Sequence, residues 1–161
     1  MTLRINNGRS TLPADRMDAT DPAVARAVYE AVLPTIYRNT PGDIFVVRTS
    51  LVPAVLSRDG WSGRFAAVAE LQSTLERAAN RPPVFYRSEA FPAGVKLVTA
   101  VESGRRSTSF TPVFFTADGR RAVVYFEHYC GNLCGEGTPV WLTRTTAGAW
   151  QIGGGLMVWN S

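Results

Sequence analysis

One segment constrains the fold of this chain more than any other: residues 121–130 alternate between two sets of side chains and run directly into a glycine-rich turn. One set comprises Ala122, Val124, Phe126, His128 and Cys130, and the other comprises Val123, Tyr125, Glu127 and Tyr129. A period of two is typical of a β-strand, whose successive side chains point to opposite faces. Because both sets begin with apolar residues, we predict a central strand that is covered on both faces at that end.

Shorter extended segments surround this strand. They comprise residues 96–101, 111–115, 140–145, 150–152 and 156–159, with a polar connection at 103–109 and a glycine-rich loop at 131–137. Pro112 is typical of a strand end or a sheet edge. The tight turns at 117–119 and 146–148 predict an antiparallel meander over the C-terminal half, and the glycines at 153–155 allow a bulge in it.

The N-terminal half is predicted to supply two helices and one short strand at 44–49. The first helix begins at Asp21 and Pro22, which suit a helix start, and Pro34 should kink or end it. The second helix is expected from Ser62 to about residue 79, before the stop at 80–83. We therefore predict a polar arm at 1–20 and one α+β domain at 21–161, with both helices packed on the meander.

Size and charge exclude several classes of protein. The chain has 161 residues, a net charge of +4 and 45% hydrophobic residues, which is typical of one globular domain. The positive charges are dispersed, so we predict no nucleic-acid partner. Because no apolar run reaches the length needed to cross a bilayer, we expect no membrane span.

Cys130 and Cys134 are the two cysteines of the chain. Glycines beside them let the backbone turn tightly enough for a disulfide, and this is the interpretation we favour. Free buried thiols, a redox or nucleophilic pair, and a zinc site completed by His128 remain alternatives, although the spacing is not a standard zinc or thiol-oxidoreductase motif. We accordingly expect no metal and no cofactor.

Candidate catalytic residues lie on both faces of the central strand. His128 and Cys130 share one face and have the chemistry of a base and a nucleophile. Glu127 shares the other face with Tyr125 and Tyr129, where aromatic surroundings can raise the pKa of a carboxyl group. The structural alternatives are a packed histidine and a Glu127 that pairs with an arginine at the sheet edge.

Residues 114–126 and 130–137, with the ending 141–161, resemble a loose group of mostly uncharacterised, often exported bacterial proteins. That group shares an ALVYV strand, a CGxLCGxG loop and a GxW.I close; here Ala149 separates Gly148 from Trp150. The resemblance covers the C-terminal third and implies the meander and export, but no catalytic residue. The overall arrangement is also similar to cone-shaped folds of the nuclear transport factor 2 type, whose sheet and helices enclose a pocket.

These observations favour an exported binding or interaction module with a disulfide-pinned loop, whose partner is a small molecule or a protein. A small pocketed enzyme that uses acid–base chemistry for hydrolysis, isomerisation or cyclisation is the first alternative. An inhibitor or immunity-type protein partner is the second. Export would place the protein in the periplasm or outside the cell, although residues 1–20 do not resemble a signal peptide and a cytoplasmic location stays open.

Overall fold

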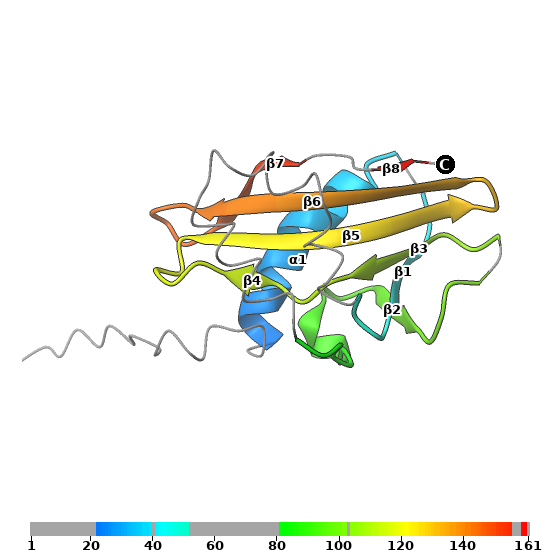
Figure 1. The fold of residues 1–161 in the computed structure, drawn as a ribbon, viewed down its shortest axis with the longest axis horizontal. Helices are drawn as coiled ribbons and strands as arrows, with labels where there is room; N and C mark the ends of the chain where they lie inside the picture. The colour runs from blue at the N-terminus through cyan, green and yellow to red at the C-terminus, as the bar shows by residue number, and fades with distance from the viewer. Residues whose placement is uncertain (1–21, 40, 52–80, 103, 156–158, 161) are drawn as a thin grey trace, which may run out of the picture.

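The computed structural model describes residues 22–39, 41–51, 81–102, 104–155 and 159–160. One helix lies against a face of an eight-stranded sheet (Figure 1). The elements are α1 (Pro22–Ile36), β1 (Ile44–Val47), the short 3-10 helix η4 (Ser88–Ala90), β2 (Val95–Val98), β3 (Ser107–Phe110), β4 (Phe114–Phe115), β5 (Arg121–Gly131), β6 (Cys134–Arg144), β7 (Trp150–Gly155) and β8 (Trp159–Asn160).

The long β5–β6 hairpin forms the centre of the sheet. On one side, β3 and β4 both pair with β5, at different points along it; on the other side, β7 and β8 both pair with β6. Each of these pairings is antiparallel. Beyond β3 lie β1 and then β2, and both pairings of β1 are parallel. The order across the sheet is therefore β2-β1-β3-β5-β6-β7.

The predicted fold class is wrong about the sheet. The sheet is mixed rather than a pure antiparallel meander, because β1 from the N-terminal half inserts between β2 and β3. Of the two predicted helices, only the first falls within the described residues, where it is α1. The second predicted helix, at 62–79, and the predicted arm at 1–20 lie outside the described residues. A parallel pairing needs a long connection, and residues 48–94 provide one between β1 and β2.

Helix α1 begins at Pro22, as predicted, but it continues past Pro34 to Ile36. Proline lacks the N–H that would bond to the carbonyl four residues earlier. Only one bond is lost so close to the helix end, and the Tyr37 amide still donates to the Leu33 carbonyl at 3.0 Å. The helix therefore ends two residues later than its proline suggests.

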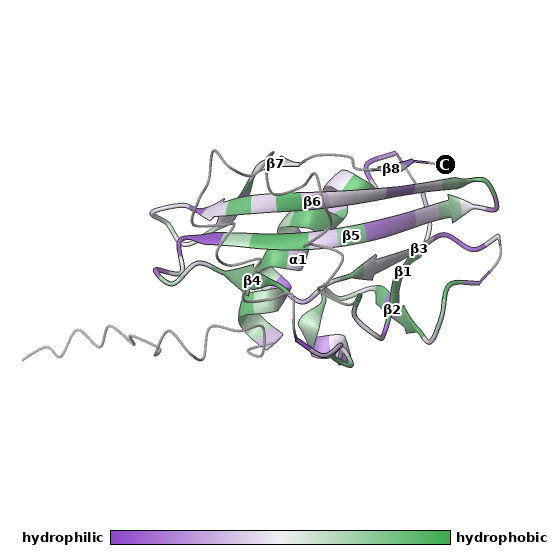
Figure 2. Cartoon of the chain, in the orientation of Figure 1, coloured by the Kyte–Doolittle hydropathy of each residue, from purple (hydrophilic) through white to green (hydrophobic). Residues whose placement is uncertain are grey.

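Strand β5 is buried on both faces over its first half, as the sequence predicts. One face contributes Ala122, Val124 and Phe126 to a core that α1 covers, and this core includes Val28, Val32, Phe110, Val140 and Leu142. On the opposite face, Val123 and Tyr125 are also buried. Figure 2 shows apolar residues along α1 and the same half of β5 and β6, whereas the hairpin is polar beyond its middle and apolar again at its tip.

The glycines of β7 make room for a tryptophan. Leu142 pairs with Ile152 and Trp141 pairs with Gly154, so Gly153 is an extra residue and forms the β-bulge that the sequence allows. A Cβ atom on Gly154 would lie less than 3.0 Å from three carbons of the Trp141 indole. The ring therefore packs directly over the glycine backbone.

Replacing Gly154 by alanine is expected to lower the free energy of unfolding by about 1–3 kcal/mol, because the added methyl group overlaps the Trp141 ring. Urea unfolding measures the change. Gly155→Ala is the matched control, since its Cβ meets atoms only at 3.4 Å or beyond. In a Trp141→Ala background the cost of Gly154→Ala should disappear. Equal effects at Gly154 and Gly155 would show that the indole does not restrict this strand.

Candidate functional site

The two cysteines lie at the tip of the central hairpin. Strand β5 ends at Gly131 and β6 begins at Cys134, so Asn132 and Leu133 form a two-residue turn. The loop predicted at 131–137 is therefore mostly strand. Tyr129 pairs with Gly135 and Gly131 with Cys134, which makes Cys130 an extra residue at the tip. The hairpin therefore has a β-bulge at Cys130, close to the turn.

Cys130 and Cys134 form a disulfide, as predicted. Their Cα atoms are 5.1 Å apart, within the range that a disulfide requires. With both sulfurs bonded to one another, neither is a thiolate nucleophile or a zinc ligand in this form. No group of three or more His, Cys, Asp or Glu side chains that could hold a metal occurs in the described part of the chain.

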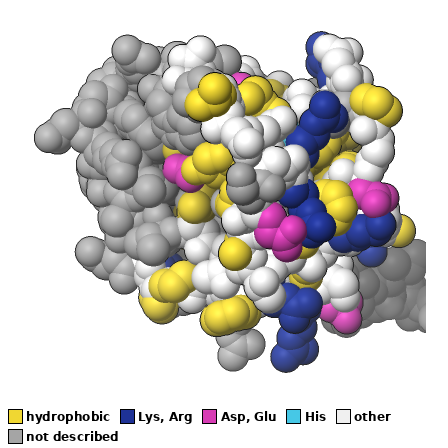
Figure 3. All heavy atoms as spheres, turned by 90° about the vertical axis from the view of Figure 1, so that its right-hand side faces the viewer, with side chains coloured by type: hydrophobic (Ala, Val, Ile, Leu, Met, Phe, Trp, Pro, Cys, Tyr) yellow, Lys and Arg dark blue, Asp and Glu magenta, His cyan; other side chains and the backbone are white. Residues whose placement is uncertain are grey.

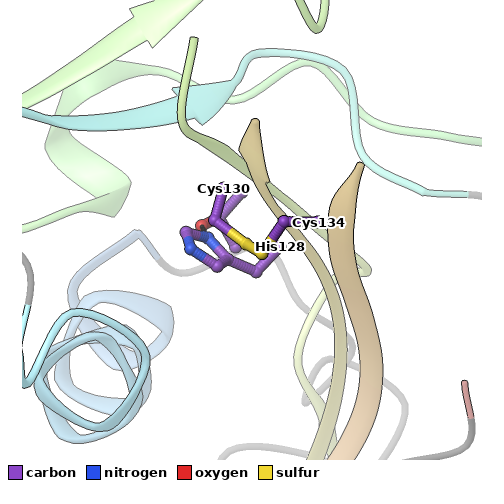
Figure 4. Close-up of a disulfide and its surroundings, with 4 residues drawn as sticks. His128, Cys130 and Cys134 are labelled. Carbon is purple, nitrogen blue, oxygen red and sulfur yellow. Dashed lines mark hydrogen bonds between the residues drawn. A yellow bond between two sulfur atoms is a disulfide. The ribbon is translucent and has the colours of Figure 1, made fainter. Parts of the chain in front are cut away.

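His128 is a packed residue on the same side of the hairpin as the disulfide (Figure 4). Only 6% of it is exposed. Its Nδ1 lies 3.0 Å from Thr108 Oγ1, which in turn lies 2.8 Å from the hydroxyl of Tyr37. The Tyr37 and His128 rings also meet edge to face, with centroids 5.1 Å apart. This polar chain joins the residue that follows α1 to β3 and β5.

The environment of His128 favours the neutral imidazole. Burial lowers the pKa of His128 below its usual value of 6.5, and the nearby charge of Arg106 lowers it further. Burial also raises the pKa of Tyr37 above its usual value. Both rings are therefore uncharged at neutral pH, and their hydrogen bonds link neutral groups.

Acidification is expected to destabilise the fold through His128. Because the pKa of His128 is lower in the folded chain, the unfolded chain binds an extra proton below about pH 6.5. The contribution to stability is fully present above that pH and is lost as the pH falls towards the folded-state pKa. Urea unfolding between neutral pH and about pH 5 should show a larger loss for the wild type than for His128→Asn. An equal loss of stability in the wild type and in His128→Asn would show that His128 does not cause the effect.

Glu127 occupies a second polar cluster on the opposite face. The Tyr125 hydroxyl donates to Oε1 of Glu127 at 3.0 Å, and the Tyr129 hydroxyl donates to Oε2 at 3.1 Å. Partial burial and the charge of Glu127 raise the pKa of Tyr129. Both carboxylate oxygens thus accept from phenols, whereas the expected partner was an arginine.

The structure does not bring the predicted catalytic residues together. His128 and Glu127 are neighbours in sequence and therefore lie on opposite faces of β5. Tyr125 and Tyr129 accompany Glu127, while Cys130 is held in the disulfide. Sequence patterns did not identify Thr108 or Tyr37. Residues 103–109 suggest a polar connection, but Ser107–Phe110 form the buried strand β3. Tyr37 follows α1 and is distant from His128 in the sequence. Ser107, Thr108 and Ser109 are all buried, but three successive polar residues give no hydrophobic pattern from which this burial could be predicted.

The searches of family models, of curated proteins and of solved structures found no match to this chain. Within the described residues, no helix is long and apolar enough to cross a membrane.

Proposed function

We propose that this chain is a non-enzymatic, exported module that binds a protein partner through the disulfide-closed end of its central hairpin. The observation that carries the proposal is Leu133, which is 90% exposed although it sits in a covalently closed turn. We call Asn132 and Leu133, together with Phe45, Lys96 and Arg105, the tip surface.

The disulfide favours binding because it reduces the freedom of the turn before any partner arrives. Ordering a flexible loop on association costs free energy, and a constrained loop avoids much of that cost. A large apolar side chain in such a turn exposes contact area that folding does not use. Exposed apolar residues within a polar rim are typical of the centre of a protein interface.

Charged side chains surround the turn. Gly104 lies beside Asn132, so the segment before β3 reaches the hairpin tip. The Arg105 guanidinium lies 5.0 Å from the centre of the Phe45 ring and also pairs with Glu102 at 3.1 Å. Figure 3, which faces this end of the molecule, shows basic, acidic and hydrophobic side chains interspersed. Such a mixed surface suits a folded protein partner better than a uniformly charged polymer.

The position of the candidate catalytic residues supports binding over acid–base catalysis. His128 is buried and hydrogen-bonded, and Glu127 lies on the other face of the same strand. The disulfide also supports export, because such bonds persist in oxidising compartments. The likeness of residues 110–161 to exported bacterial proteins points the same way.

The test is a comparison of immobilised full-length variants exposed to periplasmic and secreted fractions of the source organism. Leu133→Asp should lose a partner that the wild type retains, because a charge replaces the exposed apolar contact. Phe85→Asp is the matched control, since Phe85 is 76% exposed on another part of the molecule. Circular dichroism and urea unfolding verify that both variants fold. Equal retention by Leu133→Asp and the wild type would exclude the tip surface as the binding site.

The inhibitor or immunity-type alternative predicts that the affinity for the partner depends differently on salt. A complex held by the net positive charge should weaken steeply as ionic strength rises. A complex centred on Leu133 should weaken little, because Lys96 and Arg105 already pair with Asp43 and Glu102. Measuring the dissociation constant at low and at high salt separates the two.

A further inference from the structure

A second site is independent of the tip surface. An open hollow of about 750 Å³ lies between the C-terminal half of α1, the start of β1 and the segment that enters β2. Its walls are mainly apolar and include Leu33, Pro34, Ile44, Pro92 and Val95. Both the size and the apolar lining are typical of sites for small organic ligands.

Most polar side chains of the hollow already have partners. Glu30 is paired with Arg26 at 2.8 Å, and Thr35 Oγ1 donates to the Val32 carbonyl at 2.7 Å. The Tyr37 hydroxyl is 2.8 Å from Thr108 Oγ1 and 3.3 Å from the Phe45 carbonyl. The hydroxyls of Thr35 and Tyr37 are therefore already engaged, Tyr37 contributes mainly its ring, and the charge of Glu30 is balanced by Arg26.

Arg38 is the exception. It lines the hollow, it is exposed, and no ion pair or hydrogen bond joins its guanidinium to another side chain in the described part of the chain. Because Arg26 neutralises Glu30, the local charge at the hollow is positive. A guanidinium offers a planar fork of N–H donors that matches the two oxygens of a carboxylate.

We propose that this hollow binds a small amphipathic carboxylate, with its apolar body against the walls and its carboxylate on Arg38. The charge of Arg38 selects the anion, and the apolar walls select the body. Neutral or cationic molecules with the same body would leave Arg38 without a counter-charge.

The experiment titrates the full chain with decanoate and follows backbone amides by nuclear magnetic resonance. Shifts should saturate at residues 30–44 and 92–95. Decanol and decyltrimethylammonium, which carry the same chain without a negative charge, should bind at least about tenfold more weakly, since hydrogen bonds to charged groups contribute that much. Arg38→Gln should reduce decanoate affinity by a similar factor. Arg120→Gln, which changes an exposed arginine in a turn on another part of the molecule, should not.

Ala93→Phe gives a second arm, because a ring at this exposed lining position would occupy part of the hollow without removing charge. It should weaken the binding of every probe that enters the hollow. The proposal is overturned if decanoate gives no saturable shifts, if the shifts lie outside the hollow, or if decanol and decanoate bind equally. Unchanged decanoate affinity in Arg38→Gln would overturn it too.

Discussion

Replacing Tyr29 by alanine is expected to lower the free energy of unfolding by about 3–5 kcal/mol, the usual cost of truncating a fully buried aromatic ring. None of Tyr29 is exposed. Its ring stacks on Phe91, with centroids 4.6 Å apart, and lies 4.9 Å from the Phe110 ring. The residue therefore joins α1 to the segment before β2 and to β3. A loss of this size is a large share of the stability of an ordinary domain.

Tyr29→Phe separates the ring from its hydroxyl. That hydroxyl donates to the Thr111 carbonyl at 3.1 Å and lies 3.2 Å from the hydroxyl of Tyr86. Removing it leaves buried acceptors short of a donor, which should cost about 1–2 kcal/mol. Urea unfolding measures both variants, and Phe85→Ala, at a 76% exposed ring, should change stability by less than about 0.5 kcal/mol. A Tyr29→Ala effect as small as the control would mean that α1 does not hold the core together.

Removing the disulfide is expected to have the second largest effect. Cys130 and Cys134 are four residues apart, and closing so short a loop stabilises the fold by about 2 kcal/mol in the chain-entropy account. The Cys130→Ser/Cys134→Ser double variant should therefore unfold at lower urea, with little change in the slope of the transition. It should also bind a partner of the tip surface more weakly, because Leu133 would no longer sit in a fixed turn.

Intact-mass measurement checks the premise of this prediction. The denatured wild type should be lighter by two hydrogen atoms than its reduced form and should not react with an alkylating reagent. Cys134 is exposed, so a thiol reductant should reach the bond without unfolding the chain. Alkylation of both cysteines without reduction would contradict the pairing, and equal stability of the double variant and the wild type would contradict its energetic role.

Local sequence patterns predicted the parts of the fold that depend on local geometry. The alternation at 121–130 identified β5 and its burial on both faces, and the glycines around Cys130 and Cys134 favoured their disulfide. The start of α1 at Pro22 and the bulge at Gly153 follow from the chemistry of proline and glycine. In each case, the residues that carry the sequence pattern are the same residues that form the structural feature.

Long-range pairing could not be predicted in this way. Residues 44–47 have a clear strand composition, but nothing in them specifies a parallel neighbour, so β1 was not placed inside the sheet. The same limit applies to the candidate site. Thr108 and Tyr37 precede His128 by 20 and 91 positions in the chain. They contact His128 only once the chain has folded, Thr108 through a hydrogen bond and Tyr37 through its ring.

The interrupted strands beside the central hairpin have a consequence for the order of folding. β5 and β6 are each 11 residues long and joined by a two-residue turn, whereas their neighbours β3, β4, β7 and β8 pair with them in shorter pieces. The hairpin requires almost no loop closure, so it can form before the distant parallel strand β1 docks. Its central amides should be the slowest to exchange with deuterium, and those of β1 and β2 should exchange through smaller openings. We therefore expect the hairpin to act as a local folding nucleus, to which the remaining strands are added.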